Sequence, residues 1–199
     1  MTYPIFPTSP KPSYPYHWES GFLTIVGGPY DGGGSVTRSG RPYELFTVAL
    51  KWDRRTRAEL LPIVDFFRAR RGRSGLFVFK DFQGWDKSPI GEAWNDVYVA
   101  TYQSGGSTTV TLPVTSGSSH VVKVNGVTDA GATISAGTGD EGQDEATIAA
   151  TLAQGDIITA SFVGLLTLLV RCTQDTLAVE SEPGDLHSLT LGLIEERLT

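Results

Sequence analysis

Asp185, His187 and Ser188 are the side chains that most suggest chemistry, because an acid, a base and a nucleophile stand within four residues. A catalytic triad requires the three side chains to converge on one point. Neighbouring positions on one strand cannot do this, because successive side chains point to opposite faces. The segment GRSG, which begins at Gly72, lacks the G-x-S-x-G spacing of a nucleophile elbow. The sequence therefore favours no serine hydrolase.

Metal and phosphate sites have equally little support. The single cysteine and three histidines show no spacing that suits zinc. The acidic run from Asp140 to Glu145 fails the calcium-loop pattern, because Thr151 stands where a bidentate glutamate is required, so we interpret the run as a solvated turn. The glycine clusters GGPYDGGGS and QSGGSTT lack the Lys-Ser/Thr pair of a phosphate loop. We expect no catalytic residue, metal or cofactor, and a chain of that kind usually binds or builds.

Four tryptophans allow a binding site of another kind, a platform that stacks on sugar rings. They are Trp18, Trp52, Trp85 and Trp94. Core and subunit-interface roles are commoner for tryptophan, and we favour them. A carbohydrate-binding β-sandwich that acts in host-surface adsorption is the alternative function. It requires two or more coplanar, exposed aromatic rings.

Composition excludes further classes. The chain has 199 residues, 22 acidic against 16 basic side chains, and a formal charge of −6. A general nucleic-acid binder would show a basic excess instead. The longest apolar run, 162–170, is too short to span a bilayer, and the first residues lack a signal-peptide pattern. We expect a protein made in the cytoplasm, without membrane insertion, that needs no disulfide or metal to fold.

Alternating patterns predict strands in most of the chain. In RPYELFTVALKW, residues 41–52, the side chains of Phe46, Val48, Leu50 and Trp52 share one face. GFLTIVGG, residues 21–28, reads as the preceding strand. The later segments FVGLLTLLVRCTQDTLAVE and LHSLTLGLIEERL also read as strands. These patterns predict a mainly β protein.

One helix is expected, starting near Thr56. Thr56 and Glu59 form a capping box, in which each side chain satisfies a free backbone N–H. The helix presents an apolar stripe to the core at residues 60, 63, 64 and 67. Pro62 predicts a kink or a delayed start, and Gly72 is the expected stop.

The segment Phe66–Asp86 contains four arginines, one lysine and six aromatic residues. It fits either a nucleic-acid surface or a corner between helix and core. Cations stabilise the negative end of a helix, which explains the arginines. Phe77 and Phe79 share one face of the following strand, with Leu76 and Val78 on the other. Aromatic rings that point inward cannot stack on bases, so we favour the corner.

Two further segments frame this region. Prolines at positions 4, 7, 10, 12 and 15 predict an extended N-terminal arm, which is either a loose tail or an arm laid across a neighbouring subunit. Residues 98–160 are rich in Gly, Ser and Thr and predict a small inserted β domain. Within it, VVKVNGVT predicts a hairpin, because Asn-Gly suits a type I′ turn.

The same segment carries a resemblance. IVDFFRARRGRSGLFVFKDFQGWD is similar to the signature of distal tail proteins of long-tailed bacteriophages and gene transfer agents. In that family a helix ending in Phe-Phe-x-x-Arg-x-Gly-Arg leads to a strand of the form Gly-Phe-x-Phe-x-Asp. The matching residues here are Phe66, Phe67, Arg70, Gly72, Arg73, Gly75, Phe77, Phe79 and Asp81. Near Asp175 the match is weaker, because Leu169 and Cys172 replace the Pro and Phe of the family pattern.

The resemblance implies a β-sandwich or split barrel with one packed helix and a small all-β insert. Residues 1–97 and 161–199 would form the ring domain, and 98–160 the insert. Six copies would form a ring that joins the tail tube protein to the hub or tip protein, with tail fibres as further partners, in the virion tail tip. DNA would pass through the lumen without specific binding.

A closed ring requires two different surfaces that fit each other. We expect one surface on the arm and the other on the arginine-rich helix end with its aromatic neighbours. The interface candidates are Tyr14, Tyr16, Trp18, Arg70, Arg71, Arg73, Phe82, Trp85 and Trp94. An acidic lumen would repel DNA phosphates and let DNA slide. We also expect Arg70 or Arg73 to pair with Asp81 or Asp86.

Overall fold

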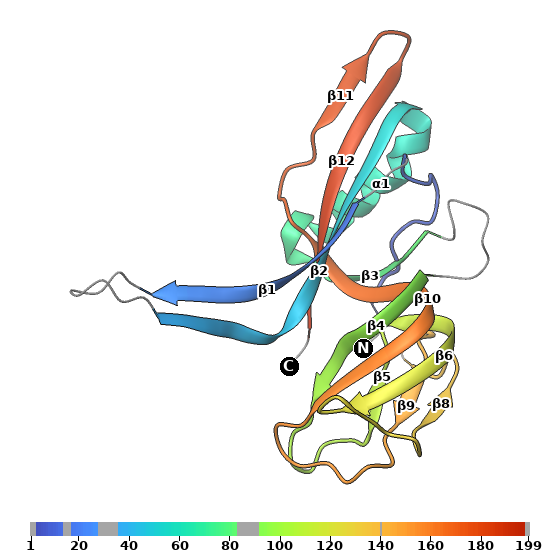
Figure 1. Ribbon diagram of the computed structural model, residues 1–199. Helices are drawn as coiled ribbons and strands as arrows, with labels where there is room; N and C mark the ends of the chain where they lie inside the picture. The colour runs from blue at the N-terminus through green and yellow to red at the C-terminus, as the bar shows by residue number, and fades with distance from the viewer. Residues whose placement is uncertain (1–2, 14–16, 28–35, 83–91, 140, 198–199) are drawn as a thin grey trace.

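The computed structural model describes residues 3–13, 17–27, 36–82, 92–139 and 141–197. Strands make up 53% of the chain and helix 11%, so the predicted mainly β class is confirmed. A curled antiparallel sheet forms a half-barrel, one helix packs on it, and a second small sheet lies beside it (Figure 1). This is the split-barrel arrangement expected from the sequence.

The elements follow one another as twelve strands, one α-helix and one 3-10 turn within the described residues. They are β1 (His17–Gly27), β2 (Val36–Thr56), α1 (Arg57–Arg70), η1 (Gly72–Ser74), β3 (Phe77–Lys80), β4 (Glu92–Thr101), β5 (Thr109–Thr111), β6 (Val114–Val124), β7 (Val127–Thr128), β8 (Thr133–Ser135), β9 (Glu145–Thr147), β10 (Ile157–Cys172), β11 (Val179–Glu182) and β12 (Leu186–Glu195).

β10 connects the two halves of the molecule. Its first part pairs with β4 and β6, and its last part pairs with β3 and β12. The large sheet has the order β1-β2-β12-β10-β6-β7, and β5-β9-β8 form the small sheet. The expected boundary between residues 160 and 161 therefore falls inside one continuous strand, and the insert begins within β4.

Two hairpins project from the body. Figure 1 shows the outer parts of β1 and β2 leaving it sideways, and β11 with β12 forming its upper end. β1 pairs only with β2 among the described strands. Phe22 on β1 is 65% exposed.

The core confirms the predicted strand faces. Phe46, Val48, Leu50 and Trp52 are all buried, as their alternation requires. The expected type I′ hairpin is present, since β6 and β7 are joined by Asn125 and Gly126 with φ of 49° and 79°. The free Cys172 is 1% exposed, and burial raises the pKa of its thiol to about 11, so it is an unreactive apolar group.

The N-terminal arm lies on its own chain. Phe6 donates its N–H to the Val78 carbonyl and is 3% exposed, packing against Phe66 and Phe77. Further along, Pro10 accepts from the Trp52 indole, and Ser13 bonds the backbone of β2. Residues 3–13 are thus neither a loose tail nor free to cross a neighbouring subunit. They pair with the edge of β3 through Ile5 and Val78, and Phe6 packs on the face that carries Phe77 and Phe79.

Helix α1 begins as predicted, and it ends as predicted, with Gly72 at the position that follows the C-cap. The capping box between Thr56 and Glu59 is present. Pro62 lies inside the helix without delaying its start. The left-handed residue that ends the helix is Arg71, with φ 55°, and Gly72 follows with φ 60°.

The turn from helix to strand depends on close approach. A Cβ placed on Gly75 would lie 2.4 Å from the Arg70 carbonyl oxygen, and one on Gly72 would lie 3.0 Å from the Asp175 Cα. Both partners are backbone atoms of packed segments. Glycine is therefore required at Gly75 for space alone, because its φ is an ordinary −97°.

We predict that Gly75→Ala destabilises the fold by about 1–3 kcal/mol, the usual cost of overpacking. For a domain of this size the melting temperature should fall by about 2–10 °C. Gly21→Ala is the control, because nothing lies within 4 Å of its added Cβ. Calorimetry should show a loss only for Gly75→Ala; equal melting temperatures would contradict the packing described here.

Candidate functional site

The arginine-rich end of α1 divides into supporting and exposed side chains. Arg70 is half-buried, and its guanidinium lies 5.9 Å from the centre of the Phe66 ring. Arg71 and Arg73 are exposed. Neither guanidinium makes an ion pair or a hydrogen bond in the part of the chain that the structure describes. Arg70 thus supports the corner, whereas Arg71 and Arg73 point their charge into solvent.

The expected ion pair with Asp81 or Asp86 does not explain this corner. The carboxylate at the turn is that of Asp175, which accepts a hydrogen bond from the Arg73 backbone N–H at 3.1 Å. Asp81 is half-buried and its N–H donates to Leu166, while Asp86 lies outside the described residues. Sequence reasoning missed Asp175 because it comes from a segment 102 positions away.

Of the aromatic interface candidates, Phe82 and Trp94 belong to the interior of this subunit. Phe82 is 7% exposed and packs edge-on against Phe79. Trp94 is half-buried, packs against Phe46 and donates its indole N–H to Gly164. Trp18 lies in β1, where its backbone pairs with Val48. The remaining candidates, Tyr14, Tyr16 and Trp85, lie outside the described residues.

The signature residues are placed where the corner requires them. Phe67, Phe77 and Phe79 are buried, and Phe66 packs edge-on against Phe77. Together with the two glycines, these rings fix the helix against β3. The inward aromatic face predicted for this segment is confirmed.

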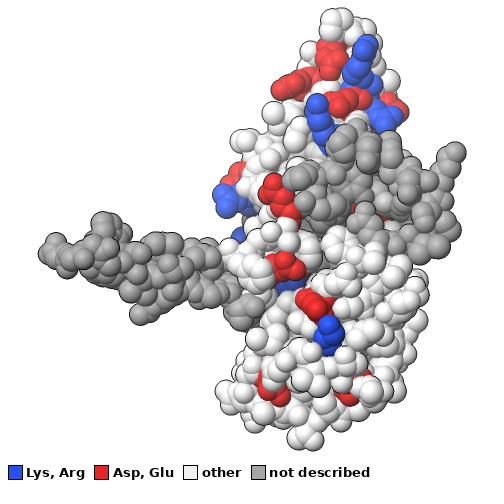
Figure 2. All heavy atoms as spheres, viewed as in Figure 1, with Lys and Arg blue, Asp and Glu red and all other residues white. Residues whose placement is uncertain are grey.

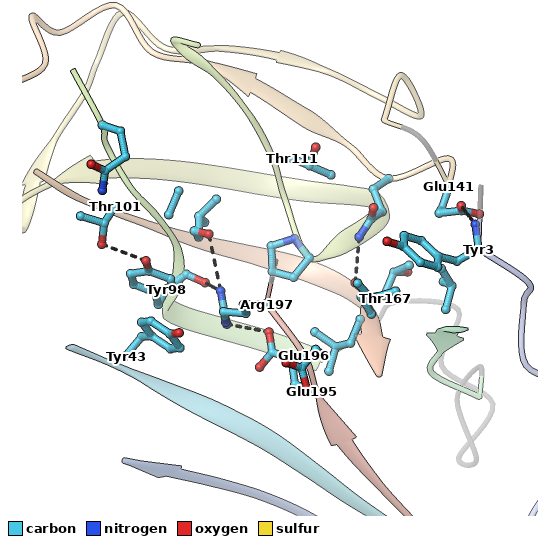
Figure 3. A pocket seen from close by; sticks show the side chains of 18 residues that line it. Tyr3, Tyr43, Tyr98, Thr101, Thr111, Glu141, Thr167, Glu195, Glu196 and Arg197 are labelled. Carbon is cyan, nitrogen blue, oxygen red and sulfur yellow. Dashed lines mark hydrogen bonds and ion pairs between the residues drawn. The ribbon is translucent and has the colours of Figure 1, made fainter. Parts of the chain in front are cut away.

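A cavity of about 840 Å³ opens between β4, the middle of β10 and the end of β12 (Figure 3). Arg197 lies against one wall, with its guanidinium 4.7 Å from the Tyr98 ring centre and 5.3 Å from that of Tyr43. It donates to the Tyr98 carbonyl at 2.8 Å and pairs with Glu195 at 2.7 Å. Arg197 therefore bonds a carbonyl of β4 and ties the end of β12 to that strand.

The other acids of the cavity are also engaged. Glu141 accepts the Tyr3 N–H at 2.8 Å, and Glu196 pairs with Arg171 at 3.0 Å. Burial raises the pKa of Glu195 above its ordinary value, and the Arg197 guanidinium opposes that shift only in part. Each charged side chain that the structure describes in the lining therefore has a partner within the fold.

The raised pKa of Glu195 determines the direction in which the free energy of unfolding changes with pH. Its carboxyl stabilises the fold fully below about pH 4.5, the unfolded value, and this contribution is lost as the pH rises through the higher folded pKa. We predict that the free energy of unfolding of the wild type, relative to Glu195→Gln, falls between pH 4 and pH 7. Denaturant titrations at several pH values test this. A relative stability that rises with pH would mean that the Arg197 pair outweighs burial.

Asp144, in the acidic run that we expected to be a solvated turn, is 0% exposed. Its carboxylate accepts N–H groups from Ser116, Gly117 and Gly137 and lies 3.2 Å from His120 Nε2. It is a hydrogen-bonding centre that joins β6 to the small sheet. No group of three or more metal-ligating side chains occurs among the described residues.

We predict that Asp144→Ala destabilises the fold by about 3 kcal/mol or more, because it leaves three donors without an acceptor in a buried site. Asp129→Ala is the matched control. Asp129 also accepts three backbone N–H groups, but largely at the exposed surface, where water can replace it. Chemical denaturation should show the smaller loss for Asp129→Ala. Equal losses would contradict the role of burial.

The remaining alternatives find little support in the geometry. Trp52 is 0% exposed and cannot stack on a sugar. His187 lies 3.5 Å from Asp185 through Nε2 and 3.2 Å from Ser181 through Nδ1, whereas the Ser188 hydroxyl donates to Glu182 at 2.6 Å. The side chain of Ser188 therefore does not join Asp185 and His187. No described helix is long and apolar enough to cross a membrane.

Comparison with known proteins adds no assignment. No model of a known protein family matches the chain, and no curated protein matches it either. The resemblance of residues 66–81 to distal tail proteins therefore stays a prediction from the sequence.

Proposed function

We propose that this protein is a structural component of a phage-like tail tip, a distal tail protein that forms a hexameric ring between the tail tube and the hub. The observation that carries the proposal is the shape of the subunit. Two hairpins leave the body in different directions, and the outer strand β1 pairs only with β2 among the described strands. Projections of this kind cost conformational entropy and gain stability when a neighbour covers them.

The helix–strand corner supports the same proposal. The signature segment folds as a rigid unit, because Gly75 must approach Arg70 and the phenylalanines fill the core. Exposed arginines emerge from this rigid unit at a fixed place. A surface that must fit the next copy of a ring requires such fixed geometry.

The proposed ring carries a strongly negative charge, since each copy contributes −6. Acidic groups toward the lumen would repel phosphates, so that DNA passes without binding. The protein would be made in the host cytoplasm and act in the virion, with the tube protein, the hub protein and tail fibres as partners.

The ring can be tested on the purified chain. Native mass spectrometry over a concentration series should give a six-fold mass, and electron microscopy should show six-fold rings with a central hole. A closed two-fold dimer, or a monomer at every concentration, would contradict the ring. Particles made without this protein should also lack a normal tail tip; intact, infectious particles would contradict the assignment to the tail.

A further inference from the structure

Arg71 occupies a position where its own backbone is strained. It has φ 55° and ψ 47°, the left-handed conformation that glycine adopts at low cost and that other residues avoid. Strain of this kind persists where a side chain is required for another purpose. The guanidinium of Arg71 is exposed and has no partner among the described residues, so its charge is available to a second molecule.

Arg73 also has an exposed guanidinium without a partner among the described residues, although its backbone is bonded differently. Its backbone N–H, and not its guanidinium, bonds the Asp175 carboxylate. Its side chain is therefore held close to Arg71 by the η1 turn while its charge stays free. We refer to Arg71 and Arg73 as the arginine face.

The opposite charge lies at the other end of the molecule. On the face that Figure 2 shows, acidic and basic side chains gather at the upper end, over β11 and β12, and fewer lie on the lower half. Arg54 pairs with Glu182 at this end, whereas Glu180 is exposed and makes no ion pair in the described chain. Asp185, in the hairpin turn, lies 3.5 Å from His187 Nε2, but its side chain is 88% exposed and can meet a second molecule. We refer to Glu180 and Asp185 as the acidic tip.

These two surfaces cannot neutralise each other within one subunit. Leu186 pairs with Thr56, which places the hairpin turn beside the start of α1. The arginine face lies beyond the other end of α1, and fourteen helical residues span about 21 Å. That separation is more than twice the Debye length of about 8 Å at physiological salt. The arginine face and the acidic tip therefore do not pair with each other within one subunit.

We infer that the arginine face of one copy binds the acidic tip of the next copy. The arm, which was the expected partner of the arginines, is already bound to its own chain. Arginine suits carboxylates, because its planar guanidinium donates two parallel hydrogen bonds. Two unlike patches at opposite ends of α1 make a head-to-tail contact, the kind that a ring requires. The inference rests on the proposed function and names the surfaces that carry it.

The test exchanges the charges of each surface. Variant A is Arg71→Glu with Arg73→Glu, and variant B is Glu180→Lys with Asp185→Lys. Each variant alone places like charges in contact and should weaken self-association by about tenfold or more. An equimolar mixture restores attraction at every contact, because the acidic face of A meets the basic tip of B, and the basic face of B meets the acidic tip of A. Sedimentation velocity should show assemblies that return on mixing.

Net charge is controlled within the experiment. The formal charge per copy changes from −6 to −10 in variant A and from −6 to −2 in variant B. If overall repulsion governed assembly, variant B would associate more strongly than the wild type. The inference predicts the reverse, and stronger association of B would overturn it.

Arg71→Gly separates binding from folding. Glycine relieves the left-handed strain, so the melting temperature should stay equal or rise while association weakens.

If variant A alone and variant B alone each assembled as strongly as the wild type, the inference would be overturned, but the proposed ring would not be contradicted. A wild-type chain that stays monomeric at every concentration would contradict both this inference and the proposed ring. Normal assembly of variant A with a loss of binding to a DNA duplex would assign the arginine face to phosphate and overturn the inference.

Discussion

The structure depends on the close approach of the helix end to β3, which glycine makes possible. A Cβ on Gly75 would lie 2.4 Å from a backbone oxygen of Arg70. Because no side chain intervenes, the phenylalanines of the helix and strand meet in one core with the N-terminal arm above them. The same tight turn forces Arg71 into the left-handed region and directs two arginines outward. One turn therefore determines both the packing of the phenylalanines in the core and the exposure of the two arginines.

Some charged side chains pair within the fold, and others are exposed where a second copy could contact them. Ion pairs in the interior, such as that of Glu195 and Arg197, close the gap between β12 and β4. Arg71 and Arg73, whose guanidinium groups have no partner in the described chain, lie just beyond the C-terminal end of α1. Exposed ion pairs contribute little to stability in solution, so these side chains add little to the fold itself. We expect them to contribute to binding when a second molecule excludes water from them.

Local features of the fold could be predicted from the sequence, because local chemistry determines them. The face of β2, the capping box at Thr56 and the Asn125-Gly126 turn each follow from spacing over a few residues. Long-range partners could not be predicted. The arm binds its own β3 through Pro4 and Phe6, and Asp175 replaces the expected Asp81 at the corner. Asp144 looked like a surface acid because its three N–H donors come from distant turns. The candidate arginines were found by composition, but their freedom from partners required the structure.

The most direct test of assembly through unlike surfaces is site-directed cross-linking of the chain with itself. Cysteines placed at Arg73 and Asp185 in one chain, treated with a short bifunctional maleimide, should give a ladder of covalent oligomers that stops at the hexamer. The native Cys172 is buried and should not react. Chains with only one of the two new cysteines should give no covalent oligomers, since unlike surfaces never bring two identical positions together. Covalent dimers from a single-cysteine chain, or no ladder from the double-cysteine chain, would contradict the account.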